Sequence, residues 1–126
     1  MSLDTVLIVE DEDSVAALEI ALAALDGVTV LISSNGGDAL ELLRRPSSKI
    51  AAVVTDLRLP HMDGFELIKA IRADDRYARL PVIVVSGETS PELAERLRAL
   101  GANAFFPKPY SPLEVRSTLK GLLHAS

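Results

Sequence analysis

Residues Ile50–Gly64 read IAAVVTDLRLPHMDG, an apolar run that stops at Asp56 and continues as a loop. The run Ile50–Thr55 is continuous rather than alternating, which predicts a β-strand buried on both faces. Four further runs of the same kind predict four more strands: Val6–Val9, Val28–Ile32, Val82–Ser86 and Ala104–Phe106.

Segments with helical spacing separate these runs. Apolar residues recur there at steps of three and four, so each segment would form a helix with one apolar face. These residues are Val15, Leu18, Leu22 and Leu25; Ala39, Leu40 and Leu43; Phe65, Ile68 and Ile71; Leu93, Leu97 and Leu100; Val115, Leu119 and Leu122. Strands that alternate with helices predict an α/β domain with a parallel sheet and helices on both of its faces.

Local signals predict where some of these helices begin and end. Ser90-Pro91 and Ser111-Pro112 each offer a capping hydroxyl followed by proline at the first helical position. Glu114 completes a capping box with Ser111. Gly27 and Gly101 stand where helix ends need a left-handed residue.

Length and composition exclude several classes of protein. The 126 residues fit one domain, so we expect a single unit over 1–126, an ordered core from about residue 4 to 124, and no output domain. A net charge of -5 disfavours direct binding to nucleic acid or to an anionic membrane. The absence of cysteine excludes disulfides and thiolate metal sites. No apolar run approaches the roughly 18 residues of a membrane helix. We therefore expect a cytoplasmic protein.

Polar residues cluster at the predicted strand ends, which in a parallel sheet share one edge and form the ligand site. Glu10 and Asp11 follow the first strand, Asp56 the third, Ser86 ends the fourth, and Lys108 follows the fifth. Each alone would be an ordinary loop, turn or surface residue. Together, carboxylates that would otherwise repel one another suit Mg²⁺. A carboxylate nucleophile, a metal, a lysine and a hydroxyl are the parts that accept a phosphoryl group.

The segment Thr55–Gly64, TDLRLPHMDG, resembles the phosphorylation loop of response-regulator receiver domains, with its D-x-x-x-P-x-x-D-G pattern. The resemblance covers nearly the whole chain, from the acidic pair after the first strand to Lys108-Pro109 after the fifth. It implies a doubly wound (βα)5 fold with the flavodoxin-like strand order 2-1-3-4-5. It also implies a signalling switch of two-component systems that is not a multiple-turnover enzyme.

The resemblance assigns roles around the acceptor. Asp56 would take a phosphoryl group from a sensor histidine kinase or phosphotransfer protein. Asp11 and Asp56 would bind Mg²⁺, or alternatively Mn²⁺, through their side chains. Arg58 would bind it through its backbone carbonyl, and Glu10 through a metal-bound water. Lys108 would pair with Asp56 at rest and with the phosphoryl group afterwards. The Lys-Pro peptide bond of the family is usually cis, so the resemblance implies a cis bond between Lys108 and Pro109.

The same resemblance implies a conformational switch. Ser86 would move toward the phosphoryl group, and Phe105 would turn into the space that it leaves. The plain alternative is that Phe105 is a permanent core residue of the fifth strand. The fourth helix, fifth strand and fifth helix would report the change to an output partner or a C-terminal output domain, or through dimerisation. Whether the chain acts alone or belongs to a longer protein stays open.

Arg58 and Glu88 lie two residues after Asp56 and Ser86. Both are expected at the rim of the pocket, facing each other. We hypothesise an ion pair that hinders water from hydrolysing the acyl phosphate, against the alternative of two independently solvated charges.

Three other classes compete with this interpretation. A haloacid-dehalogenase-type phosphatase also uses an aspartate and Mg²⁺, with its nucleophile after the first strand in a D-x-D pattern. Here Asp11 is followed by Glu12 and Asp13, but no Thr or Val stands at the place that family expects and we expect no cap domain. A nucleotide-binding module would need a glycine-rich phosphate loop, and neither common pattern occurs. A receiver-like domain that is never phosphorylated is disfavoured by the intact acceptor, metal, hydroxyl and lysine positions.

Overall fold

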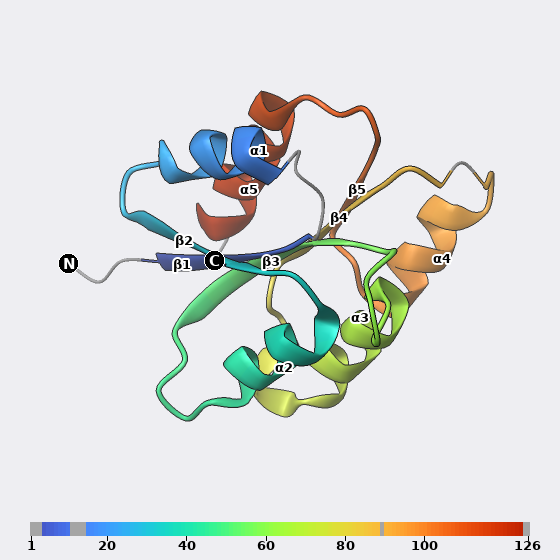
Figure 1. Cartoon of the computed structure of the whole chain (residues 1–126), viewed down its shortest axis with the longest axis horizontal. Helices are drawn as coiled ribbons and strands as arrows, with labels where there is room; N and C mark the ends of the chain where they lie inside the picture. Colours follow the sequence, from blue (N-terminus) through green and yellow to red (C-terminus); the bar gives the residue numbers. More distant parts are fainter. Residues whose placement is uncertain (1–3, 11–14, 89, 125–126) are drawn as a thin grey trace.

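Five parallel strands form one sheet in the order β2-β1-β3-β4-β5 (Figure 1). A computed structural model describes residues 4–10, 15–88 and 90–124. The strands are β1 (Asp4–Val9), β2 (Val28–Ser33), β3 (Ile50–Asp56), β4 (Val82–Ser86) and β5 (Ala104–Pro107). The predicted α/β class and strand order are confirmed.

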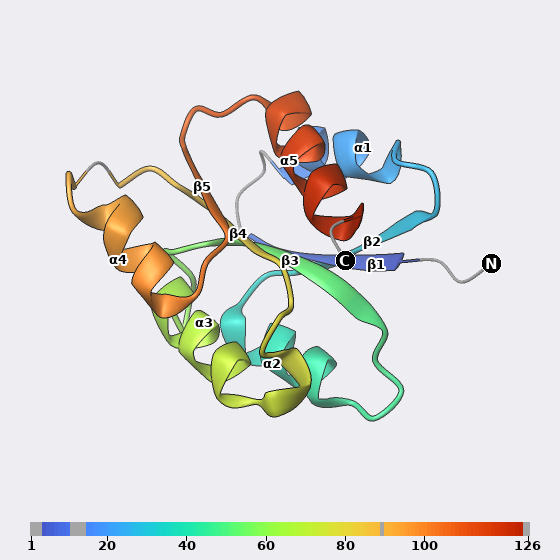
Figure 2. The same cartoon turned by 180° about the vertical axis from the view of Figure 1, so that it is seen from behind.

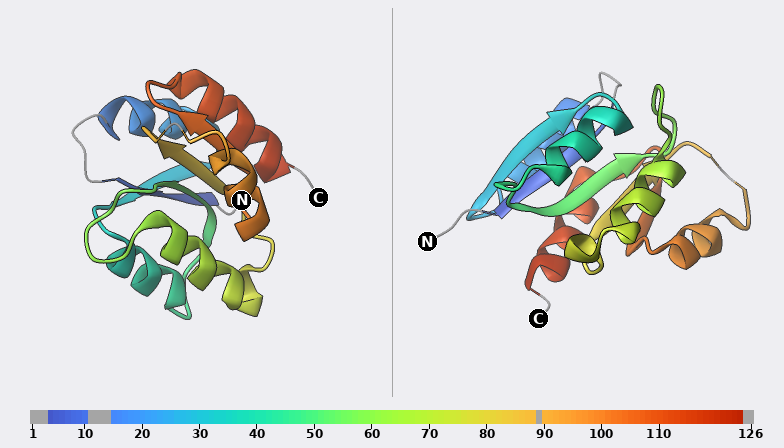
Figure 3. Two further views of the ribbon diagram at one scale, coloured as in Figure 1. Left: turned by 90° about the vertical axis from the view of Figure 1, so that its right-hand side faces the viewer. Right: turned by 90° about the horizontal axis from the view of Figure 1, so that it is seen from below.

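Helices cover both faces of the sheet. They are α1 (Val15–Ala23), α2 (Gly36–Arg44), α3 (Gly64–Ala73), α4 (Leu93–Leu100) and α5 (Pro112–His124), with a short 3₁₀ turn η1 (Asp75–Tyr77) after α3. Figures 1 and 2 show α1 and α5 above the sheet and α2 and α3 below it, and the left view of Figure 3 shows the same layers from the side. None of the helices in the described ranges is long and apolar enough to cross a membrane.

Two apolar cores lie on opposite faces of the sheet. On one face, Leu7 and Val53 pack with residues of α2 and α3. On the other face, Ile8 and Val54 pack with residues of α1 and α5. Successive strand residues point to opposite faces, and both faces are covered. The three inner strands β1, β3 and β4 are therefore buried on both sides, as their apolar runs predict.

The two outer strands do not match that prediction. In β2, Leu31 and Ile32 are 42% and 41% exposed. The residues of β5 are partly buried, and its last residue, Pro107, is exposed. Both segments do form strands, as their apolar composition predicts, but each has a neighbouring strand on one side only. A strand at the edge of the sheet is less covered by neighbouring residues, and its position in the sheet cannot be read from its composition.

Helix ends follow the predicted signals in part. Ser111 precedes α5, and its hydroxyl accepts a hydrogen bond from the Glu114 backbone amide at 3.3 Å. Gly101 ends α4 in the left-handed conformation, with φ 107°. Gly27 is also left-handed, with φ 75°, but it lies in the turn before β2 and beyond the end of α1 at Ala23. The prediction that Gly27 caps α1 is therefore wrong.

The predicted start of α4 is also wrong. The helix begins at Leu93, and Glu92 precedes it without a side-chain cap. The Ser90 hydroxyl instead donates to the Glu92 carboxylate at 2.8 Å and does not cap a backbone amide of α4.

Arg72 of α3 ties the far end of α4 to the rest of the domain. Its Nε and Nη2 donate to the Gly101 carbonyl at 3.1 and 2.7 Å. Its Nη1 donates to the Tyr77 carbonyl at 2.8 Å, and Nη2 also donates to Asn103 Oδ1 at 3.2 Å. One guanidinium thus holds α3, η1 and the α4–β5 turn together.

The β3–α3 loop contains a tight turn centred on His61. His61 has φ 70°, and the Met62 amide donates to the Pro60 carbonyl at 2.8 Å. A positive φ strains a residue that carries a Cβ, at a cost of about 1–3 kcal/mol.

We expect His61→Gly to raise the free energy of unfolding by about 1 kcal/mol, because glycine adopts this conformation without strain but loses more entropy on folding. Urea denaturation measures it. Ser47→Gly, at an exposed position with ordinary φ, is the matched control and should lower stability slightly. A loss of stability in both variants would contradict the prediction.

Candidate functional site

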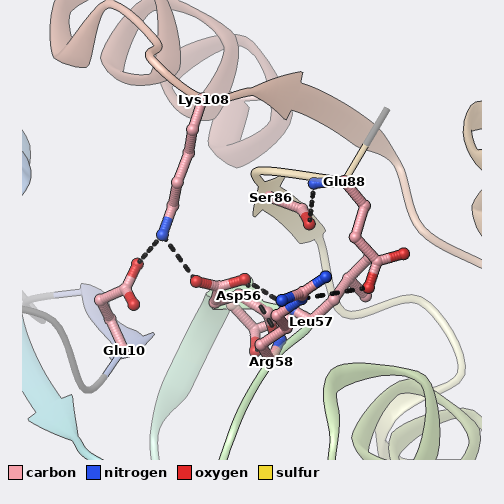
Figure 4. A network of polar contacts seen from close by, with 8 residues as sticks. Glu10, Asp56, Leu57, Arg58, Ser86, Glu88 and Lys108 are labelled. Carbon is pink, nitrogen blue, oxygen red and sulfur yellow. Dashed lines mark hydrogen bonds and ion pairs between the residues drawn. The ribbon is translucent and has the colours of Figure 1, made fainter. Parts of the chain in front are cut away.

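Asp56 ends β3 and is held by contacts on both carboxylate oxygens (Figure 4). The side chain is almost fully buried. Oδ1 accepts hydrogen bonds from the backbone amides of Leu57 and Arg58 at 2.6 and 3.2 Å. Oδ2 lies 2.6 Å from Lys108 Nζ. The carboxylate is thus fixed in orientation at the carboxyl edge of the sheet.

Lys108 reaches this point from the residue after β5. Its backbone amide donates to the Ser86 carbonyl at 2.8 Å, which extends the pairing of β4 and β5 by one residue. The Lys108–Pro109 peptide bond is cis, as expected from the resemblance. The Nζ atom also lies 3.2 Å from Glu10 Oε2, so one ammonium group pairs with two buried carboxylates.

Glu10 is buried without the hydrogen bonds that a buried carboxylate needs. It is 3% exposed, and neither side-chain oxygen has a hydrogen-bond partner among the described residues, although Oε2 lies in the ion pair with Lys108. Burial, followed by the charge of Asp56, raises the pKa of Glu10 to about 7, against the opposing effect of Lys108.

These two carboxylates fit a hard divalent cation. Mg²⁺ takes oxygen ligands from one or two carboxylates, and the oxygens of Glu10, which accept no hydrogen bond among the described residues, lie beside Asp56 with Lys108 as the one cation paired with both. Within the described residues no group of three His, Cys, Asp or Glu side chains meets at one point. Asp11, the other predicted ligand, lies outside the described residues. The Arg58 carbonyl also stays a predicted ligand.

Ser86 ends β4, is buried, and lies near Asp56 (Figure 4). Its Oγ accepts a hydrogen bond from the Glu88 amide at 3.1 Å. Phe105 pairs with Val84 in β5 and packs, partly buried, against the core on the α3 and α4 side. This environment is compatible with both the core and the switch interpretations, so the predicted motion stays a prediction.

Arg58 and Glu88 do face each other at the rim. Arg58 Nε lies 3.7 Å from Glu88 Oε1, with side chains 81% and 32% exposed. An exposed pair of this kind contributes about 0–1 kcal/mol to stability. The geometry of the pair agrees with the hypothesis, whose effect on acyl-phosphate lifetime stays a prediction.

Backbone groups contribute more to the site than the sequence pattern indicates. The backbone amides of Leu57 and Arg58 donate to Asp56. Almost every residue has such an amide, so the sequence does not indicate which ones take part in the site. Thr55 Oγ1 donates to the Asp56 carbonyl at 2.8 Å. Gly64 begins α3 against this turn, and a Cβ there would lie against the Asp56 carbonyl and 2.7 Å from Leu57 Cα. The Asp-Gly pair of the loop motif is the one signal that points to this close approach.

Comparison with known proteins identifies the class of protein that has this fold and site. Residues 6–120 match the family model of the response regulator receiver domain. The chain belongs to that family.

Individual relatives agree with this assignment. The chain is 30% identical over 119 residues to a chemotaxis protein CheY homolog of Campylobacter jejuni, covering 93% of this chain and 90% of the relative. It is 34% identical over 119 residues to the sensor kinase CckA of Brucella abortus, covering 94% of this chain but only 12% of the kinase.

A solved structure is similar over the whole chain. It is the receiver domain of a sensor histidine kinase from Pseudomonas aeruginosa PAO1, with a magnesium ion coordinated in the active-site cleft. The TM-score is 0.82 at 25% identity, and the match covers 98% of this chain and 100% of that structure.

Proposed function

We propose that Asp56 accepts a phosphoryl group from the phosphohistidine of a sensor histidine kinase or phosphotransfer protein. The observation that carries this proposal is the buried Asp56 carboxylate, oriented by two backbone amides and paired with Lys108 Nζ at 2.6 Å. Both features suit a nucleophile that must be aimed at an incoming phosphorus atom.

The transfer forms one bond and breaks one bond. A carboxylate oxygen of Asp56 attacks phosphorus, the P–O bond forms, and the P–N bond to the donor histidine breaks, leaving a neutral imidazole once a proton is taken up. Lys108 then shifts from the carboxylate to the phosphoryl oxygens and neutralises their charge. The backbone amides of Leu57 and Arg58 keep the remaining carbonyl oxygen in place.

Glu10, Asp56 and the predicted ligands Asp11 and Arg58 would hold Mg²⁺ beside the acceptor. When bound, the metal would supply positive charge to the transferring phosphoryl group. The family of the chain and the magnesium site of the similar receiver domain support this proposal.

The domain acts as a switch that takes up phosphate in stoichiometric amount in the cytoplasm, rather than as a multiple-turnover enzyme. Ser86 follows the phosphoryl group, and Phe105 responds. The face formed by α4, β5 and α5 carries the change to an output partner, an output domain or a second copy. The partial burial of Phe105 and its place beside α4 support this route.

Asp56→Asn is expected to abolish uptake of phosphate, because an amide is not a nucleophile toward phosphorus. The measurement is titration with acetyl phosphate or beryllofluoride in Mg²⁺, followed by NMR and intact mass. Asp75→Asn, at an exposed position in η1, is the matched control and should retain full uptake. Equal uptake by Asp56→Asn and the native chain would disprove the assignment of the acceptor.

Arg58→Ala is expected to shorten the lifetime of the acyl phosphate by several-fold, because the Arg58–Glu88 pair no longer obstructs water. Loss of phosphate after removal of the donor measures this lifetime. Glu88→Gln should act in the same direction, and Arg79→Ala, an exposed arginine preceding β4, should have no effect. An unchanged lifetime in Arg58→Ala rules the obstruction out.

A further inference from the structure

The outer edge of β2 is unprotected. The strand ends the sheet next to β1, and no other strand of the described chain pairs with its free side (Figure 3). Its six residues, VTVLIS, include neither a charged residue nor proline. Proteins commonly blunt edge strands with lysine, proline or a bulge, because free backbone groups can pair with another chain.

Apolar side chains are exposed along this edge. Leu31 is 42% exposed and Ile32 is 41% exposed. Leu31 is in register with Leu7, whose side chain faces α2, and Ile32 is in register with Ile8, whose side chain faces α1. Neighbours in register point to the same face, so an exposed apolar side chain lies on each face of the edge.

Helix α2 presents a charged face beside β2. Ile32, Ser33 and Ser34 line a shallow groove together with Asp38, Glu41, Leu42 and Arg45. Asp38 and Leu42 are four residues apart and share one face of the helix, and Arg45, just after the helix, lines the same groove. Asp38 lies in the first turn and also accepts a hydrogen bond from the Asn35 amide group at 2.9 Å. Arg45 directly follows the last helical residue, Arg44, in an extended conformation, and its side chain has no hydrogen bond or ion pair with the rest of the described chain.

We propose that β2 pairs antiparallel with β2 of a second copy of this chain, forming a dimer with one continuous sheet. The two-fold axis of such a pair is perpendicular to the sheet, so the two α2 helices lie side by side on the same face and run in opposite directions. Asp38 of each copy then faces Arg45 of the other copy, and the two Leu42 side chains meet between these ion pairs.

The spacing of the elements suits this arrangement. Helix α2 contacts both β1 and β2, and neighbouring strands lie about 4.8 Å apart. Pairing through β2 therefore places the two α2 axes about 10 Å apart, close to the 8–10 Å at which helices pack. Asp38 and Arg45 are complementary across the two-fold axis, as an isologous interface requires, whereas Glu41 of the same groove adds one negative charge from each copy near that axis and weakens the contact.

The opposite face limits the strength of association. Helix α1 also contacts β2, and its single charged residue in the described part is Glu19. The described part of α1 has no basic residue to pair with Glu19 of the other copy, so this face contributes no ion pair between the copies. We therefore expect a weak dimer that forms at high protein concentration.

The proposed dimer differs from one formed through α4, β5 and α5. Strand β5 is the opposite edge of the sheet. Antiparallel pairing at β2 also points the two carboxyl edges in opposite directions, so both Asp56 sites stay open to a phosphate donor. The dimer does not depend on phosphorylation.

Sedimentation equilibrium from about 10 to 1,000 µM tests the proposal. The mean mass of the native chain should rise from 13.5 kDa toward twice that value. Leu31→Lys places a charge on the edge and should keep the chain monomeric. Leu113→Lys makes the same change at a 58% exposed leucine of α5 and should not alter association. A monomeric native chain, or dissociation by Leu113→Lys but not by Leu31→Lys, overturns the proposal.

Charge reversal tests the geometry directly. Asp38→Arg alone sets arginine against arginine, and Arg45→Glu alone sets two carboxylates against each other, so each variant should be monomeric. An equal mixture restores opposite charges at both contacts and should dimerise like the native chain. Lys69→Glu, an exposed change on α3, should leave association unchanged. Failure of the mixture to associate overturns the arrangement.

Discussion

Gly64→Ala is expected to lower the free energy of unfolding by about 3 kcal/mol and to slow phosphate uptake by Asp56. The added Cβ would lie against the Asp56 carbonyl and 2.7 Å from Leu57 Cα, and both of these are backbone atoms that cannot rotate away. Overpacking costs about 1–3 kcal/mol, with larger values where the backbone must move. To make room for the added methyl group, α3 must move away from β3. This movement would also weaken the hydrogen bond from the Gly64 amide to the Leu57 carbonyl, which is 2.9 Å long in the native chain.

Urea denaturation followed by phosphate uptake measures both effects. Gly121→Ala is the matched control, because a Cβ at Gly121 in α5 meets nothing within 4 Å. Alanine is the better helix former, so this control should gain about 0.5–1 kcal/mol. Equal stability of Gly64→Ala and the native chain would show that α3 does not need the close approach.

Lys108→Met is expected to lower the free energy of unfolding by about 2 kcal/mol without Mg²⁺ and to slow phosphate uptake at least 100-fold. The change leaves the buried carboxylates of Asp56 and Glu10 without the ammonium group that lies 2.6 and 3.2 Å away. Breaking a fully buried ion pair costs about 3–5 kcal/mol. The Lys108 side chain is 18% exposed, so the expected loss is smaller. Loss of a charge that stabilises a transition state typically costs about 10²–10³ in rate.

A double-mutant cycle separates this pairing from lost packing. In an Asp56→Asn background one buried charge is absent, so Lys108→Met should cost distinctly less stability than in the native chain. Lys69→Met, which removes an exposed lysine of α3, should be nearly neutral. An equal cost in both backgrounds would mean that Lys108 stabilises the fold through its apolar stem alone.

The fold could be predicted where side-chain periodicity decides it. The three inner strands and the start of α5 at Pro112 follow directly from apolar runs and a capping hydroxyl. The exposure of β2 and the late start of α4 could not be predicted from these signals. Exposure depends on strand order, and the Ser90 hydroxyl had a competing acceptor in Glu92.

The candidate site could be predicted to the level of converging side chains. Glu10, Asp56, Ser86 and Lys108 meet because each ends or follows a parallel strand. The orientation of the Asp56 carboxylate could not be predicted, since it comes from backbone amides. The lack of hydrogen-bond partners for the Glu10 oxygens could not be predicted either, because it results from the burial of the side chain in the folded domain.

The two ends of α4 are anchored unequally. At its C-terminal end, the amide of left-handed Gly101 donates to the last carbonyls of the helix, and the Gly101 carbonyl accepts two hydrogen bonds from Arg72. Its first turn has no side-chain cap at all. The first turn is held by the packing of the buried Leu93 side chain rather than by a cap, so it can be displaced with fewer broken hydrogen bonds than the end at Gly101. If α4 is displaced when the domain switches, we therefore expect a larger displacement at Leu93 than at Gly101.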